Sequence, residues 1–113
     1  MAVDYWLIER ESATVGIPAG GEERATRFYG EVLGMEPLPG EGFRSQGLQL
    51  RLDIEVPFRP VEQLAAMVVS DLEALLARLA EHGVRADGEQ LEFFQRVVVH
   101  DPFGNGLELI AER

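Results

Sequence analysis

Near its C-terminus the chain reads Asp101-Pro102-Phe103-Gly104-Asn105-Gly106-Leu107-Glu108-Leu109. Asp, Pro and Gly at the first, second and fourth positions favour a type I turn. Because apolar residues flank this turn at 97–99 and 107–109, the segment predicts a β-hairpin. Glu108 stands between two leucines on the second strand, so its side chain points to the opposite face of the sheet. Glu108 is a site residue if that face lines a cavity, and ordinary surface if the face meets water.

The rest of the chain contains the same order of predicted elements twice. In the first half, residues 12–18 predict a strand and about 22–33 a helix, and three strands follow at 35–38, 43–45 and 48–54. Apolar residues at helical spacing mark the buried face of the helix, and strict alternation marks the last strand. After a proline-containing linker, the second half predicts a strand at 64–69, a helix opening with the capping box Ser70–Glu73, and strands near 84–87, 94–100 and 107–111.

This duplication predicts an α+β fold. Two βαβββ modules, at about residues 12–56 and 62–112, form a curled eight-stranded mixed sheet with the helices outside. The two half-sheets then curl around a shared cavity. Residues 1–11 are an N-terminal extension, and the run Tyr5-Trp6-Leu7-Ile8 within it could be an added edge strand or a dimer contact.

The composition limits the classes of function. A length of 113 residues fits one domain, 1–113, with a single core. The absence of cysteine excludes disulfides, thiolate metal sites and cysteine nucleophiles. A formal charge of −10 argues against binding to nucleic acids, whose phosphates would be repelled, and the short apolar runs argue against a membrane span. Since no export signal is evident, we expect a cytoplasmic protein.

Five segments, in this order, resemble the vicinal oxygen chelate superfamily, which includes glyoxalase I, bleomycin-resistance proteins and extradiol dioxygenases. They are 18–23 (PAGGEE), 28–34 (FYGEVLG), 58–60 (FRP), 69–75 (VSDLEAL) and 101–108 (DPFGNGLE). The resemblance covers roughly residues 12–111. It implies the duplicated βαβββ fold and a homodimer, because small members of the family usually complete or share their cavities between subunits.

The resemblance also implies where a metal ion would be held. Enzymes of the superfamily bind a divalent ion through His, Gln or Glu side chains from four strands, and the matching positions here are Ser12, Arg51 (less well Gln49), Leu64 and Glu108. Only Glu108 suits such an ion, since leucine has no donor atom, a serine hydroxyl is a poor ligand and arginine adds positive charge. We therefore expect no metal and no other cofactor.

Glu108 and Arg51 are then expected on the cavity faces of equivalent strands. One interpretation is a charge-assisted pair in the place of the lost metal. Arg51 could alternatively hold an anionic group of a ligand, or both residues could be independent surface charges. Phe58 and Phe94 are further candidates, because they could stack on a flat ligand. His100 is another, and its direction depends on a one-residue change of register.

Three hypotheses of function follow. The first is a metal-free protein that binds a drug-like molecule or metabolite, similar to the bleomycin-resistance branch. The second is a metal-dependent lyase, isomerase or dioxygenase of the glyoxalase type, which Glu108 favours and which Arg51 and Leu64 oppose. The third is a non-catalytic domain for dimerisation or for interaction with another protein.

Overall fold

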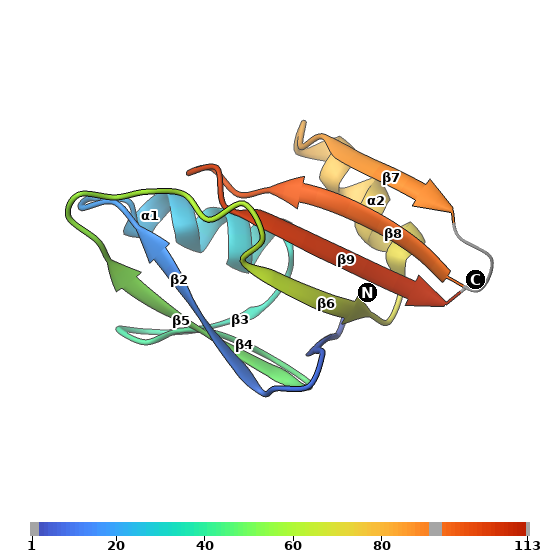
Figure 1. The fold of residues 1–113 in the computed structure, drawn as a ribbon, viewed down its shortest axis with the longest axis horizontal. Coiled ribbons are helices and arrows are strands. Elements are labelled where there is room, and N and C mark those ends of the chain that lie inside the picture. Colours follow the sequence, from blue (N-terminus) through green and yellow to red (C-terminus); the bar gives the residue numbers. More distant parts are fainter. Residues whose placement is uncertain (1–2, 91–93, 113) are drawn as a thin grey trace.

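The computed structural model confirms two successive βαβββ modules (Figure 1). It describes residues 3–90 and 94–112, so residues 1, 2 and 113 of the predicted domain lie outside the described part, as do 91–93. The first module comprises β2 (Ser12–Ile17), a helix made of α1 (Glu22–Ala25) and η1 (Thr26–Val32), β3 (Glu36–Leu38), β4 (Gly42–Ser45) and β5 (Leu48–Ile54). The second comprises β6 (Ala65–Val69), α2 (Leu72–Glu81), β7 (Ala86–Gln90), β8 (Phe94–His100) and β9 (Gly106–Glu112). A further strand, β1 (Tyr5–Leu7), precedes both modules.

The strands form two sheets, whereas the sequence predicted a single sheet of eight strands. Their order is β1-β6-β9-β8-β7 in the five-stranded sheet and β2-β5-β4-β3 in the four-stranded sheet. Both sheets are mixed, since β6 runs parallel to β9 and β2 parallel to β5. The additional strand is β1, which pairs with β6, so the N-terminal run is an edge strand. The sheets meet at an isolated bridge between Trp6 and Gly47, where the indole leaves no room for a side chain on the glycine.

The first helix buries the apolar stripe that its sequence predicted. Ala25, Phe28, Tyr29, Val32 and Leu33 are all buried. The spacing had predicted an α-helix throughout, but the second part, η1, has π-helical geometry. The five side chains are nevertheless buried, because the wider turn of the π-helix still places them against the sheet.

The second helix begins one residue later than the capping box predicted. Its N-cap is Asp71, whose carboxylate accepts a hydrogen bond from the Ala74 amide at 3.0 Å. The hydroxyl of Ser70 instead accepts a hydrogen bond from the Asp4 amide at 2.9 Å. The prediction was wrong because the N-terminal segment, far away in sequence, occupies the serine oxygen.

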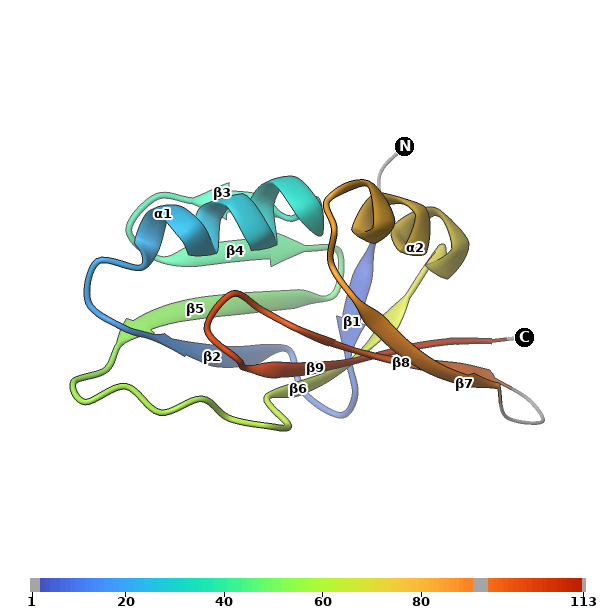
Figure 2. The same ribbon diagram turned by 90° about the horizontal axis from the view of Figure 1, so that it is seen from above.

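Both helices lie on the same side of the molecule, with the first helix above β5 and β2 and α2 above the five-stranded sheet (Figure 2). Within the described residues, neither helix covers the opposite side of the sheets, which we call the open face. The layer between helices and sheets is the apolar core, and its largest fully buried side chains include Tyr29, Phe43, Leu50, Leu75, Leu79 and Leu109. No described helix combines the length and the apolar character needed to cross a membrane.

A buried polar network ties the turn before β9 to the first module. The Asp101 carboxylate accepts hydrogen bonds from the Tyr29 hydroxyl at 2.7 Å and from the Asn105 backbone amide at 2.9 Å. The Asn105 side chain donates to the Gly16 carbonyl at 3.0 Å and accepts from the Val61 amide at 2.9 Å. Because Gly16 and Tyr29 belong to the first module, this network fixes where β9 begins relative to that module.

Candidate functional site

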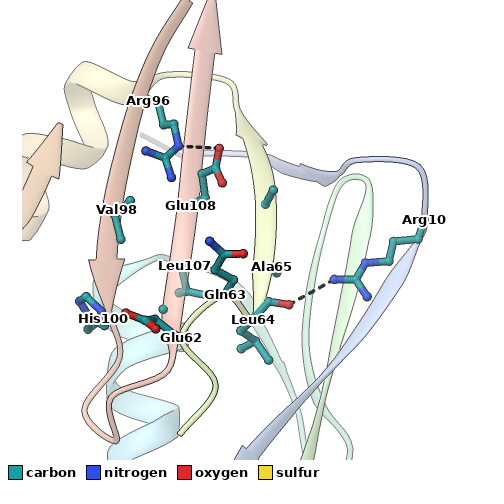
Figure 3. A pocket seen from close by; sticks show the side chains of 12 residues that line it. Arg10, Glu62, Gln63, Leu64, Ala65, Arg96, Val98, His100, Leu107 and Glu108 are labelled. Atoms are coloured by element: carbon teal, nitrogen blue, oxygen red, sulfur yellow. Dashed lines mark hydrogen bonds and ion pairs between the residues drawn. The ribbon is translucent and has the colours of Figure 1, made fainter. Parts of the chain in front are cut away.

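A hollow of about 400 Å³ lies on the open face of the five-stranded sheet (Figure 3). This volume is within the range of small-molecule sites, roughly 300–1,000 Å³. Strands β6, β8 and β9 and the segment before β6 supply most of its surface. The residues that line it are Arg10, Glu62, Gln63, Leu64, Ala65, Ala66, Arg96, Val98, His100, Gly106, Leu107 and Glu108. The hollow therefore contains three of the residues that the sequence singled out, namely Leu64, His100 and Glu108.

Glu108 lies on β9 between two apolar neighbours. In the sheet register it is opposite Ala66 on β6 and Val98 on β8. Its side chain is 31% exposed, whereas Leu107 and Leu109 on the helix side are fully buried. The face opposite the leucines lines a hollow, so Glu108 remains a candidate site residue.

The carboxylate of Glu108 is paired with Arg96. The Arg96 Nε atom donates to Glu108 Oε1 at 2.8 Å, and Figure 3 shows the two side chains pointing toward each other from neighbouring strands. A second carboxylate oxygen, Oε1 of Glu89 on β7, lies 3.4 Å from Arg96 Nη1. The hydrogen bond to Glu108 and the negative charge of that residue raise the pKa of the Arg96 guanidinium. Arg96 is therefore a fixed cation at the edge of the hollow.

The pairing of Glu108 with Arg51, one of the interpretations of the sequence, was wrong for the isolated chain. Arg51 is exposed on β5 of the other sheet, opposite Thr14. Ser12 and Gln49 are paired with each other on that same sheet. None of these three candidates lines the hollow. The cause is the division into two sheets, which separates equivalent strands that the prediction had placed around one cavity.

The aromatic candidates also lie away from the hollow. Phe58 packs edge-on against Phe103, with the ring centroids 6.2 Å apart. Phe94 is 37% exposed near the start of β8 and is not among the lining residues. His100 does line the hollow, at the end of β8, and its side chain is exposed.

Among the lining residues that were not sequence candidates, Arg96 and Arg10 supply the guanidinium groups of the hollow. Arg96 could have been found from the hairpin, since pairing His100 with Gly106 places residues 96, 98 and 100 on the same face as Glu108. Arg10 could not, because it reaches the hollow from the irregular segment before β2. There its Nη2 atom donates to the Leu64 carbonyl at 3.2 Å.

The donor groups of the hollow do not fit a divalent metal ion. Leu64 has no side-chain donor, and one oxygen of Glu108 is already bonded to a guanidinium. Within residues 3–90 and 94–112, no three His, Asp or Glu side chains are grouped as metal ligands. The hollow instead combines two guanidinium groups and two carboxylates with apolar surface from Ala66 and Val98. Such a lining suits a ligand that is held by hydrogen bonds and charge.

Comparison with known proteins identifies the family of the chain. Residues 13–109 match the family model described as Glyoxalase/Bleomycin resistance protein/Dioxygenase superfamily. No curated protein sequence matches the chain.

Three solved structures illustrate the structural similarity. A glyoxalase family protein from Bacillus anthracis has 26% identity and a TM-score of 0.82, over 96% of this chain and 98% of its own. TnmS3, an antibiotic binding protein from Streptomyces sp. CB03234, has 24% identity and a TM-score of 0.70, over 94% of this chain and 98% of its own. The oxidase ChaP-H2 has 18% identity and a TM-score of 0.70, over 94% of this chain and 96% of its own. At these identities the last two share the fold alone.

Proposed function

The chain belongs to the Glyoxalase/Bleomycin resistance protein/Dioxygenase superfamily, and from that membership we propose that it binds a drug-like molecule or metabolite in the open-face hollow without a divalent metal ion. The observation that carries the proposal is the pair of Arg96 and Glu108. The guanidinium balances the charge of the carboxylate that would otherwise attract a metal ion. TnmS3, which has the same fold and binds an antibiotic, supports binding as the function.

The lining of the hollow defines the kind of ligand. Ala66 and Val98 flank Glu108 and provide an apolar floor. Arg10 and Glu62 add groups of opposite charge to the lining. A ligand with a flat apolar part and polar or charged substituents would satisfy both, because ligand sites combine apolar area with a few polar groups that fix orientation.

A thermal-shift screen tests this proposal. Flat cationic drugs and small carboxylates are added to the wild-type protein, since a ligand that binds only the native state raises the melting temperature. Ala66→Tyr fills the hollow from the open face without altering a core position, and Thr14→Tyr makes the matched change on the other sheet, where Thr14 is exposed. Hits should stabilise the wild type and Thr14→Tyr but not Ala66→Tyr. A panel without hits, or hits that stabilise Ala66→Tyr equally, would contradict the proposal.

The alternative is a metal-dependent lyase, isomerase or dioxygenase, and Glu108 is the residue that favours it. The protein can be loaded with Zn, Ni, Mn and Fe, dialysed and analysed for its metal content. If the wild type retains stoichiometric metal and Glu108→Gln does not, the metal-dependent enzyme is favoured over the binding proposal. The expected result is no stoichiometric retention, because Arg96 occupies the carboxylate.

We also propose that the protein is a homodimer associated through the open face. Trp6, Val68 and Ile110 lie side by side on β1, β6 and β9, in register across the sheet. Trp6 and Val68 are each 37% exposed, and a second copy would cover them. Sedimentation analysis should give a dimer for the wild type and a monomer for Val68→Glu. If Val68→Glu is still dimeric, the dimer forms through another surface. If the wild type is a monomer, the homodimer proposal is wrong, and so is the dimerisation part of the third hypothesis.

A further inference from the structure

A second concave surface lies beside the first helix and shares one lining residue, His100, with the open-face hollow. It consists of two adjoining hollows, of about 220 and 300 Å³, that share Phe28, Val84 and Pro102. One wall consists of residues of the first helix and the other of residues in the turn between α2 and β7. We call this surface the cationic groove. Val84 and Pro102 supply most of its apolar floor, because the core residues Phe28 and Val32 are almost fully buried.

The charges around this floor are unusual for so acidic a chain. The whole protein has ten basic residues, two histidines and a formal charge of −10. Three of its arginines and both histidines line the groove: Arg24, Arg27, Arg85, His82 and His100. The acidic residue that lines it is Asp87. Positive charge is therefore concentrated over an apolar floor, while the rest of the molecule is strongly negative.

Arg24 is held in place, whereas the other two guanidinium groups can turn toward a ligand. Arg24 Nη2 donates to the Pro102 carbonyl at 3.1 Å, and its guanidinium lies over the Phe103 ring at 5.1 Å. Arg27 is 3.5 Å from Glu23 and Arg85 is 3.0 Å from Asp87, with both arginine side chains largely exposed. Exposed ion pairs of this kind contribute little to stability, so an anion can compete for these arginines.

From this arrangement we propose that the cationic groove is a second ligand site, for a small amphiphilic carboxylate. The apolar tail lies on Val84 and Pro102, and the carboxylate accepts hydrogen bonds from Arg27 and Arg85, which stand on opposite walls. Arginine suits this role because its planar donors match the two oxygens of a carboxylate. The groove shares His100 with the open-face hollow but does not depend on the function proposed for that hollow.

Calorimetric titration with decanoate tests the inference, with decanol and decyltrimethylammonium as neutral and cationic ligands of equal chain length. All measurements are made at the same pH, pH 8. Decanoate should bind at least about tenfold more tightly than either analogue, a difference of about 1.4 kcal/mol. The double variant Arg27→Gln/Arg85→Gln should bind decanoate at least about tenfold more weakly.

Two controls keep the result specific. Arg44→Gln/Arg59→Gln removes the same charge from two exposed arginines outside the groove and should leave the affinity unchanged. Ala66→Tyr blocks the open-face hollow and should also bind decanoate normally. Absence of decanoate binding, equal affinity for decanol, an unaffected Arg27→Gln/Arg85→Gln variant, or loss of binding in Ala66→Tyr would each overturn the proposal.

Discussion

Replacing Asn105 with alanine removes the side chain that joins the two modules at their most buried polar contact. Asn105 is fully buried, and its amide donates to the Gly16 carbonyl at 3.0 Å and accepts from the Val61 amide at 2.9 Å. In Asn105→Ala the buried Gly16 carbonyl and the less buried Val61 amide both lose this partner, and Asp101 loses the hydrogen bond from the Asn105 amide group. At about 1–3 kcal/mol for the buried Gly16 carbonyl, and less for the Val61 amide, which water can reach, the loss is at least about 1–3 kcal/mol. A typical stability is about 5–15 kcal/mol, so the loss is large enough to measure.

Urea unfolding measures this loss directly. The transition can be followed by the fluorescence of Trp6, the single tryptophan of the chain. The midpoint should fall strongly in Asn105→Ala with little change in the slope, because the same surface is exposed on unfolding. Gln46→Ala, at an exposed position, is the matched control and should stay within about 0.5 kcal/mol of the wild type. A loss of less than about 1 kcal/mol in Asn105→Ala would refute the idea that this network holds the modules together.

Three further predictions concern stability and the contact between the sheets. Gly106→Ala should destabilise the protein, as measured by urea unfolding, because a Cβ there would collide with the Glu62 carbonyl oxygen; an unchanged midpoint would show that this approach is not tight. Burial and the hydrogen bond to Asp101 keep the pKa of the Tyr29 phenol well above its usual value. Ionisation of this phenol therefore favours the unfolded state, and the free energy of unfolding should fall above about pH 10. The fall due to this phenol is at most about 1.4 kcal/mol per pH unit. Tyr29→Phe should flatten that fall in alkaline urea titrations, and an identical slope would assign the fall to other groups. Gly47→Ala should displace the indole of Trp6 and shift its emission, whereas an unchanged spectrum would mean that the two sheets do not meet at this contact.

Local patterns in the sequence were sufficient for the elements themselves. The apolar stripe of the first helix and the alternation around Glu108 depend on neighbours within a few residues, and both predicted the buried face correctly. The N-cap of α2 was missed because Ser70 is bonded to Asp4, a contact between residues far apart in the sequence. Periodicity contains no information on such contacts.

The candidate site shows the same limit. The outward face of Glu108 followed from its two leucines, but its partner depended on how the strands are arranged in sheets. One interpretation of the sequence placed Arg51 beside it, from the equivalence of the two modules, yet β5 and β9 belong to different sheets. Arg96 is the partner because β8 is hydrogen-bonded to β9. The register of the hairpin predicts this pairing. A shift of the register by one residue would instead have placed Arg96 on the opposite face from Glu108.

Calorimetric titration of the strongest screening hit into EDTA-stripped protein measures whether the open-face hollow acts as a receptor by itself. Stoichiometric binding to the stripped wild type, at least about tenfold weaker in Ala66→Tyr, is the result that the Arg96–Glu108 pair and its apolar surroundings predict. Binding that returns only when a divalent ion is added back, or equal affinity in Ala66→Tyr, would contradict it.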